Sequence, residues 1–234
     1  MHKNCVDRYF IVHVNSHILQ IQDLEKYDSQ HMFKVYDEWP KIAEESFKSN
    51  QKKINFKNIN HIIFAGMGGS GAIGDVFASI LSKTNIHVGV VKGYHLPTTA
   101  NSNTLVIPIS ISGNTDETIK ILKESYQRNC KLIAFTSGGK IEKICSEKSI
   151  EFRKIKEFHS PRASFPSFLY SILNILSSIL PIKYEEVIES IKNLKQLQKK
   201  IYSKNISEKN QAISLAEWIK DTPLVYYPFG LQSS

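Results

Sequence analysis

A loop rich in hydroxyl side chains follows an apolar run near the middle of the chain. Residues 110–118 read Ser-Ile-Ser-Gly-Asn-Thr-Asp-Glu-Thr, directly after Leu105–Ile109. Hydroxyl groups and the free N–H groups at the start of a helix direct hydrogens toward one point, which suits a phosphate group. Asp116 and Glu117 fit the first helical turn, where negative charge opposes the helix dipole. The alternative is an ordinary capped loop, in which the same hydroxyls only satisfy backbone donors.

A glycine-rich segment occupies the same kind of position earlier in the chain. Residues 66–71 read Gly-Met-Gly-Gly-Ser-Gly and lie between an apolar run and a helical stretch over 72–82. The pattern matches the fingerprint of dinucleotide sites, but those sites also require an acidic residue after the next strand. That strand, 86–91, is followed by Lys-Gly-Tyr and lacks the carboxylate. We therefore expect a small phosphorylated ligand, with the Ser70 hydroxyl facing the loop at 110–115.

Composition restricts the class of partner. The chain has 234 residues and a net charge of +8, but its lysines are interleaved with acids and no long basic run occurs. We therefore expect no nucleic-acid partner. No stretch approaches the roughly 20 apolar residues of a membrane span, so no membrane partner is expected either. Cys5, Cys130 and Cys145 lack metal-ligand spacing and are odd in number, which is typical of a reducing compartment. These features favour a cytoplasmic enzyme, or part of one.

The elements around the two loops follow a repeating order. Short apolar runs alternate with helical patterns; the runs are 61–65, 86–91, 104–109, 131–135 and 149–155. Continuous apolar runs are typical of buried parallel strands, and the intervening helices provide the crossovers between them. The sequence predicts an α/β fold with a doubly wound, five-stranded parallel sheet flanked by helices. Ligands bind such sheets at the carboxyl ends of the strands, where both loops lie.

Helices are also predicted on either side of the sheet region. Apolar spacing predicts one helix over Met32–Ser49, and a mostly apolar stretch, 164–180, predicts a buried helix. Two amphipathic helices follow, over 184–202 and 207–220, and Ser207 is the expected cap of the second. Arg162 lies between the last strand and the buried helix. Its forked guanidinium suits an anionic ligand, although a surface ion pair is the alternative.

Four motifs in order suggest a family. They are GMGGSG at 66–71, the serine loop at 110–118, SGG at 137–139 and PRA at 161–163. In this order they resemble the archaeal-type bifunctional phosphoglucose/phosphomannose isomerases, which are built from two sugar isomerase (SIS) domains. The resemblance extends over roughly residues 24–230. It implies a flavodoxin-like, three-layer α/β sandwich for each domain.

The resemblance also implies a division of the chain. Residues 24–181 correspond to the amino-terminal SIS domain and 182–220 to a helical linker. Residues 221–234 resemble the start of a second SIS domain in truncated form, and residues 1–23 are an unassigned extension. The apolar helix at 168–180 and the start of the second domain, 224–227, leave apolar surface that a complete second domain would cover. This surface predicts self-association or a homodimer.

Ligand contacts follow from the same resemblance, motif by motif. They fall on Gly69, Ser70, Ser110, Ser112, Thr115 and Arg162. In the family the hydroxyls hold the phosphate of the sugar, and the arginine lies beside C1 and C2 and stabilises an enediolate. The family interconverts glucose 6-phosphate or mannose 6-phosphate with fructose 6-phosphate, and no metal or organic cofactor is implied. One departure is Ile111, where the family usually has tyrosine.

The resemblance places the proton-transferring groups elsewhere. The family's base, its ring-opening histidine and a late lysine correspond to positions beyond Ser234. We therefore expect this chain to bind a phosphosugar but not to isomerise it alone, with Arg162 as its only catalytic group. His159 is the one local acid–base candidate, and a supporting or surface role fits it better. Two alternatives are a non-catalytic sugar-phosphate sensor and, disfavoured by the missing acid, a dinucleotide-dependent oxidoreductase.

Overall fold

A parallel sheet forms the centre of the protein. The computed structural model describes residues 21–207 and 209–219, so the predicted start of a second domain and Cys5 lie outside the described residues. The strands are β1 (His61–Ala65), β2 (His87–Val91), β3 (Thr104–Ser110), β4 (Lys131–Leu132), β5 (Ala134–Thr136) and β6 (Phe152–Lys154). They run in the order β2-β1-β3-β5-β6, with β4 also paired to β3. The predicted α/β class and parallel sheet are confirmed.

Strand order reverses between β1 and β3. Each residue of β1 has a parallel partner on both sides, so that His61 pairs with His87 of β2 and with Thr104 of β3. The chain therefore leaves β1 for one edge of the sheet and returns to β3 on the other side of β1. The carboxyl ends of strands at such a reversal are the usual ligand position in sheets of this kind.

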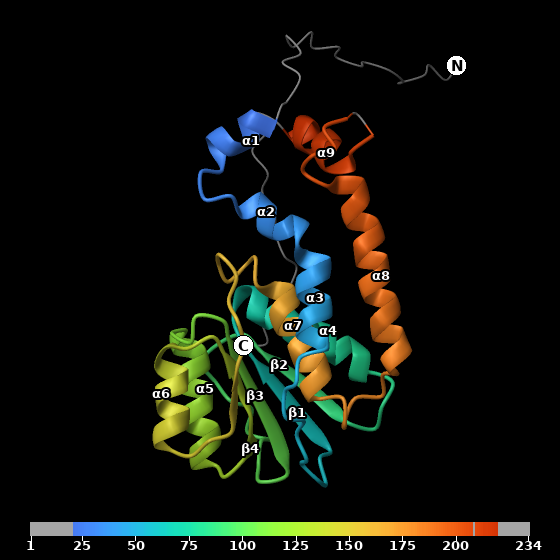
Figure 1. Ribbon diagram of the computed structural model, residues 1–234. Coiled ribbons are helices and arrows are strands. Elements are labelled where there is room, and N and C mark those ends of the chain that lie inside the picture. The colour runs from blue at the N-terminus through green and yellow to red at the C-terminus, as the bar shows by residue number, and fades with distance from the viewer. Residues whose placement is uncertain (1–20, 208, 220–234) are drawn as a thin grey trace, which may run out of the picture.

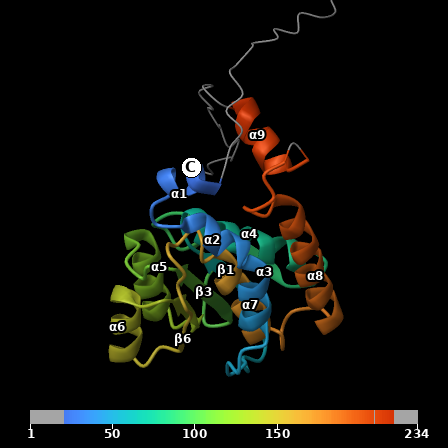
Figure 2. The same ribbon diagram turned by 45° about the horizontal axis from the view of Figure 1, so that its top comes forward.

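Helices cover both faces of the sheet (Figures 1 and 2). On one face lie α5 (Asp116–Gln127) and α6 (Gly139–Glu147); on the other lie α3 (Trp39–Phe47), α4 (Gly68–Leu81), α7 (Phe165–Ile175) and α8 (Tyr184–Ile201). Adjacent strand residues point to opposite faces. Ile63 accordingly joins the core under α5 and α6, whereas Phe64 joins the core under the other layer. Both cores are buried, which explains the continuous apolar runs of the central strands β1 and β3.

Several predicted boundaries are corrected. The single helix expected over Met32–Ser49 is divided at Glu38 into α2 (Met32–Asp37) and α3. Pro40 stands at the second position of α3, where its missing N–H has no intrahelical role to lose. The fourth predicted strand is split into β4 and β5, and the fifth is confined to β6. Both remain parallel members of the sheet.

The last helix also begins later than predicted. It is α9 (Gln211–Ile219), and the short α1 (Ile21–Tyr27) lies at the other end of the described residues. The Oδ1 atom of Asn210 accepts a hydrogen bond from Ala212 N at 3.0 Å, so Asn210 takes the capping role expected of Ser207. Ser207 instead donates its hydroxyl hydrogen to Asn205 Oδ1 at 3.0 Å. No helix within residues 21–207 and 209–219 has both the length and the apolar character needed to cross a membrane.

Candidate functional site

The glycine loop closely approaches the end of β3. A Cβ atom at Gly66 would lie 2.8 Å from the carbonyl oxygen of Ile109 and 2.9 Å from Cβ of Ser70, so a side chain there would force the loop away. Ser70 is buried in the first turn of α4, and Gly69 beside it is exposed. Glycine at position 66 thus brings the start of α4 against the strand that carries the hydroxyl loop.

The amino terminus of α4 has no side-chain cap. Met67 precedes the helix without forming a cap hydrogen bond, and the first turn contains no acidic residue. The N–H of Ser70 bonds back to the carbonyl oxygen of Met67 at 3.0 Å, which accounts for one donor. Helix N termini keep unpaired N–H groups and a positive partial charge in this situation. They suit an anion.

The hydroxyl loop begins at the last residue of β3. Ser110 is buried there, and its Oγ accepts a hydrogen bond from Gly113 N at 3.1 Å and lies 3.0 Å from Oγ1 of Thr115. Ser112 is exposed, and its Oγ accepts from Asn114 N at 3.3 Å. Part of this pattern is what a capped loop would show, because two hydroxyls bond to backbone donors of their own loop.

The start of α5 distinguishes the two interpretations. Thr115 is the residue at the cap position, yet its side chain forms no cap hydrogen bond and is directed to Ser110 instead. The first N–H groups of α5 therefore lack a side-chain acceptor, as at α4. Two uncapped helix N termini follow β1 and β3, the adjacent strands at the reversal of strand order. Asp116 and Glu117 offset part of the positive charge at the start of α5, so the position of both termini at this reversal, more than the absent caps, favours an anion site over an ordinary capped loop.

A third loop fixes the shape of the hydroxyl loop. Gly113 has a φ of +69°, and a Cβ atom there would lie 1.8 Å from the carbonyl oxygen of Gly138. The N–H of Lys140 donates to Oδ1 of Asn114 at 3.1 Å, and the N–H of Ile141 donates to the carbonyl oxygen of Gly113 at 2.9 Å. The first turn of α6 is thus occupied by the hydroxyl loop. The SGG motif at 137–139 holds that loop in place.

Arg162 lies in the segment that joins β6 to α7. Its guanidinium is exposed and forms no ion pair or hydrogen bond with any other residue in the described ranges, so the predicted alternative of a surface ion pair is not observed. The segment itself is fixed, because Trp39 Nε1 donates to the carbonyl oxygen of Ala163 at 2.8 Å. The hydroxyl of Ser164 also donates to the carbonyl oxygen of Ser160 at 2.8 Å. The structure gives Arg162 no direct contact with the two loops.

His159 lies in the same segment. It is exposed and has a left-handed backbone conformation, with a φ of +59°. Hydrogen bonding from the N–H of Phe33 lowers the pKa of the Asp28 carboxyl, and the nearby His159 acts in the same direction. His159 therefore lies beside the residues between α1 and α2, which fits the surface role predicted for it.

Lys92 places a positive charge beside the glycine loop, and the sequence analysis did not predict this position. It follows β2, and its Nζ lies 2.6 Å from Oδ2 of Asp75 in α4. The side chain crosses Gly71 closely, since a Cβ atom at that glycine would lie 3.1 Å from Cε of Lys92. An ammonium group is thus held beside the glycine loop. The contact depends on the absence of a side chain at Gly71, which sequence spacing alone does not show.

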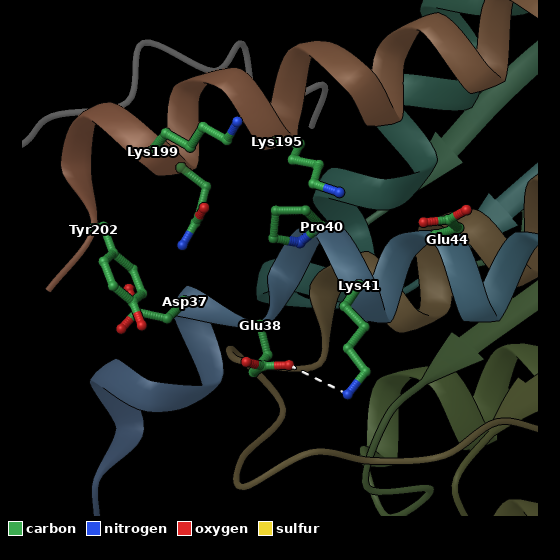
Figure 3. A pocket seen from close by; sticks show the side chains of 9 residues that line it. Asp37, Glu38, Pro40, Lys41, Glu44, Lys195, Lys199 and Tyr202 are labelled. Carbon is green, nitrogen blue, oxygen red and sulfur yellow. Dashed lines mark ion pairs between the residues drawn. The ribbon is translucent and has the colours of Figure 1, made fainter. Parts of the chain in front are cut away.

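A separate cleft lies between α3 and α8 (Figure 3). It has a volume of about 500 Å³ and is lined by charges of both signs, among them Asp37, Glu38, Lys41, Glu44, Lys195 and Lys199. The mixed charges suit a hydrated groove better than a phosphate site. None of the predicted ligand-binding residues lines this cleft. Among the described residues, no group of three or more His, Cys, Asp or Glu side chains is arranged to hold a metal ion.

Comparison with known proteins identifies the family. The SIS domain family matches residues 55–180, which include all three loops and Arg162. This chain belongs to the SIS-domain family. The match spans the sheet with α4 to α7, the part of the structure that carries the candidate site.

Curated relatives agree with the predicted resemblance. The bifunctional phosphoglucose/phosphomannose isomerase of Caldicellulosiruptor bescii is 30% identical over 190 residues, which are 79% of this chain and 56% of the relative. The protein of the same name from Aquifex aeolicus is 32% identical over 165 residues, covering 70% of this chain and 50% of the relative. This SIS-domain chain therefore spans only about half the length of these relatives.

A solved structure shows the same fold. A hypothetical protein from Thermus thermophilus superimposes with a TM-score of 0.58 at 14% identity, covering 85% of this chain and 50% of that one. Identity this low supports the arrangement of sheet and helices and nothing finer. Together the comparisons confirm the predicted family resemblance and the α/β sandwich.

Proposed function

We propose that this chain binds a phosphosugar between the glycine loop and the hydroxyl loop, at the carboxyl ends of β1 and β3. The observation that carries the proposal is the pair of uncapped helix N termini, α4 and α5, at the reversal of strand order. A phosphate group there would accept hydrogen bonds from free N–H groups and from neighbouring hydroxyls. The names of the curated relatives support glucose and mannose phosphates as the ligand class.

In this proposal each predicted residue has a stated role. Ser110, Ser112 and Thr115 hold the phosphate through their hydroxyls, and Gly69 and Ser70 bind it from the other loop. Arg162, which is exposed and lacks a charged partner among the described residues, stabilises negative charge on the reacting part of the sugar. The reaction that this serves is aldose–ketose isomerisation of glucose 6-phosphate or mannose 6-phosphate to fructose 6-phosphate.

We propose further that this chain carries only the binding half of the isomerase. It spans about half the length of the relatives, and the motif resemblance assigns the base and the ring-opening histidine to their other half. Residues 24–181 would form the amino-terminal SIS domain of a cytoplasmic, dimeric enzyme, and 182–220 the linker. Proton transfer between C1 and C2 requires a base near a carbon-bound hydrogen, so binding without turnover is expected.

Calorimetry with glucose 6-phosphate tests the binding site. The purified chain should bind with roughly millimolar affinity, because half of the pocket belongs to the other half of the relatives. Ser112→Asp should abolish binding, since a carboxylate at that position repels the phosphate. Ser102→Asp is the matched control, because it adds the same charge at an exposed position beside the amino end of β3. Equal binding by the wild type and Ser112→Asp would refute the site.

A coupled assay of fructose 6-phosphate formation separates the catalytic proposal from the sensor alternative. The chain alone should show no turnover above background. Addition of the separately expressed carboxyl-terminal half of the Aquifex aeolicus relative should restore some activity if this chain is half of an isomerase. Binding without any restored activity would favour the non-catalytic alternative. Turnover by the chain alone would contradict the proposed division, and loss of that turnover in His159→Ala would identify the missing acid–base group.

A further inference from the structure

The connection between β2 and β3 is fixed along α5. Leu96 is buried, and its N–H donates to Oε2 of Glu124 at 3.4 Å. One residue further on, the carbonyl oxygen of Pro97 accepts a hydrogen bond from Nη1 of Arg128 at 2.9 Å. Glu124 and Arg128 lie one turn apart on α5 and form an ion pair with each other. The connection therefore has a defined position against this helix.

Tyr94 occupies the end of this connection nearest the start of α5. Nζ of Lys120 lies 5.7 Å from the centre of the tyrosine ring. The Glu117 carboxylate raises the pKa of the Tyr94 phenol, mainly through its negative charge and also through its interaction with the hydroxyl. Residues 117, 120, 124 and 128 share one face of the helix because their spacing is three or four. Tyr94 is thus held by the upper part of the same face that fixes Leu96 and Pro97.

Tyr94, which lies against Lys120 one turn along α5 from Glu117, is close to the candidate site. Tyr94 follows β2, Glu117 follows β3, and β1 with its glycine loop lies between those two strands. Glu117 is also only two residues from Thr115. The pair therefore lies near the end of the sheet at which the glycine loop and the hydroxyl loop meet. Tyr94 nevertheless keeps 46% of its surface exposed, so its hydroxyl group is accessible from solvent.

The chemistry of the pair differs from that of the phosphate loops. A carboxylate only accepts hydrogen bonds and repels a phosphate, whereas a phenol both donates and accepts. Sugar hydroxyl groups are uncharged and can donate to one and accept from the other. The pair is accordingly suited to the sugar ring or chain of a ligand whose phosphate lies at the helix N termini.

We propose that Tyr94 and Glu117 bind hydroxyl groups of the phosphosugar and thereby favour a phosphorylated sugar over a bare phosphate ion. This inference rests on the proposed function, because it requires the phosphate to lie between the two loops. It assigns a sugar-recognition role to two residues outside the set of phosphate contacts. Loss of either hydrogen-bonding group should weaken sugar phosphate binding without weakening the binding of a bare phosphate ion.

Calorimetric titrations of the full chain with glucose 6-phosphate and with inorganic phosphate test this inference. Tyr94→Phe and Glu117→Gln should each weaken glucose 6-phosphate binding by about three- to tenfold, the range for one lost hydrogen bond. Inorganic phosphate affinity should stay within about twofold of the wild type in Tyr94→Phe, because the phosphate contacts are retained. In Glu117→Gln it should be unchanged or higher, because a charge that repels phosphate is removed. Tyr126→Phe is the matched control. Like Tyr94, Tyr126 is exposed and has a lysine, Lys148, over its ring. Tyr126 belongs to the carboxyl end of α5, however, and so lies far from the candidate site.

The outcomes separate this inference from the proposed function. Unchanged glucose 6-phosphate binding in both variants, with binding lost in Ser112→Asp, would overturn the inference and keep the phosphate site. An equal loss for glucose 6-phosphate and inorganic phosphate would also overturn it, since the pair would then support the loops and not the sugar. Failure of the wild-type chain to bind either ligand would overturn both proposals. Thermal unfolding of each variant shows whether the fold is retained.

Discussion

Gly113 is the residue on which the shape of the hydroxyl loop depends most. Its φ of +69° disfavours any residue with a side chain, and its missing Cβ makes room for the carbonyl oxygen of Gly138. Gly68 has a similar φ of +53°, but a Cβ atom there would meet nothing within 4 Å. Substitution of Gly68 therefore tests the cost of the backbone conformation alone, whereas substitution of Gly113 adds the cost of a clash with Gly138.

We predict that Gly113→Ala destabilises the protein clearly more than Gly68→Ala. A left-handed backbone costs a residue with a side chain about 1–3 kcal/mol, and Gly113→Ala adds a clash with backbone to that cost. The free energies of unfolding from urea denaturation provide the measurement. Similar losses in the two variants would mean that the contact between the hydroxyl loop and the start of α6 is not needed for stability.

At the scale of elements, the amino ends of β1 and β2 carry a pair of histidines. The ring centres of His61 and His87 are 4.8 Å apart, and Nδ1 of His61 lies 3.2 Å from Oγ1 of Thr104. Partial burial lowers the pKa of His61, and the neighbouring His87 lowers it further. The folded protein therefore binds a proton at this position less readily than the unfolded chain does.

The sign of the resulting pH dependence follows from linkage. Below about pH 6.5 the unfolded chain gains a proton that folded His61 still rejects, so stability falls with decreasing pH until the lowered folded pKa is passed. The loss should be smaller in His61→Asn than in the wild type and unchanged in His95→Asn, which alters an exposed histidine. Urea denaturation at neutral and mildly acidic pH measures it. The same pH response in the wild type and His61→Asn would contradict the assignment.

The hydrogen bond between Trp39 and Ala163 joins α3 to the segment that carries Arg162. Replacement of Trp39 by phenylalanine removes the donor and leaves a carbonyl oxygen of buried Ala163 without its partner. We expect Trp39→Phe to lower the free energy of unfolding by about 1–3 kcal/mol. Trp218→Phe, at a residue that is 75% exposed on α9, should change it little. Equal effects in the two variants would show that the bond does not stabilise the segment.

For the whole molecule, exposed apolar side chains on α8 and α9 predict self-association. Leu197 and Ile201 of α8 and Leu215 and Trp218 of α9 are all exposed, and large apolar side chains gathered at one end of a molecule favour association. Sedimentation velocity should show a dimer that increases with protein concentration. Combined Leu215→Ser and Trp218→Ser should weaken it, whereas Tyr126→Ser, at an exposed tyrosine near the carboxyl end of α5 and away from α9, should not (Figure 1). A monomer at every concentration would argue against the predicted homodimer.

The sequence predicted the sheet well because its central strands, β1 and β3, are buried on both faces. Leu105–Ile109 and residues 61–65 are continuous apolar runs, so their place in a parallel sheet could be inferred without a structure. The division of the first helix at Glu38 was missed because apolar residues keep helical spacing across it, although Pro40 is a signal for a helix start at this point. The boundary of α9 was missed because both Ser207 and Asn210 are suitable capping residues and the structure uses Asn210.

The candidate site was predicted in part for a similar reason. Both loops could be placed at the carboxyl ends of strands from their position after apolar runs. The direction of the Thr115 hydroxyl, the passage of Lys92 over Gly71 and the contact of Tyr94 with Glu117 could not be placed. Each of these depends on residues that are distant in sequence or on a choice between competing hydrogen bonds. Only the packed structure shows them.

The central claim is that two loops form one phosphosugar site, and amide NMR tests it most directly. Titration of the labelled chain with glucose 6-phosphate should shift the amide signals of Gly68–Ser70 and of Ser110–Asp116 together, with one common dissociation constant. Glucose without phosphate should shift neither set, because the uncapped helix termini bind the phosphate. Shifts confined to one loop, or spread over the lysine-rich surface without saturation, would contradict the claim.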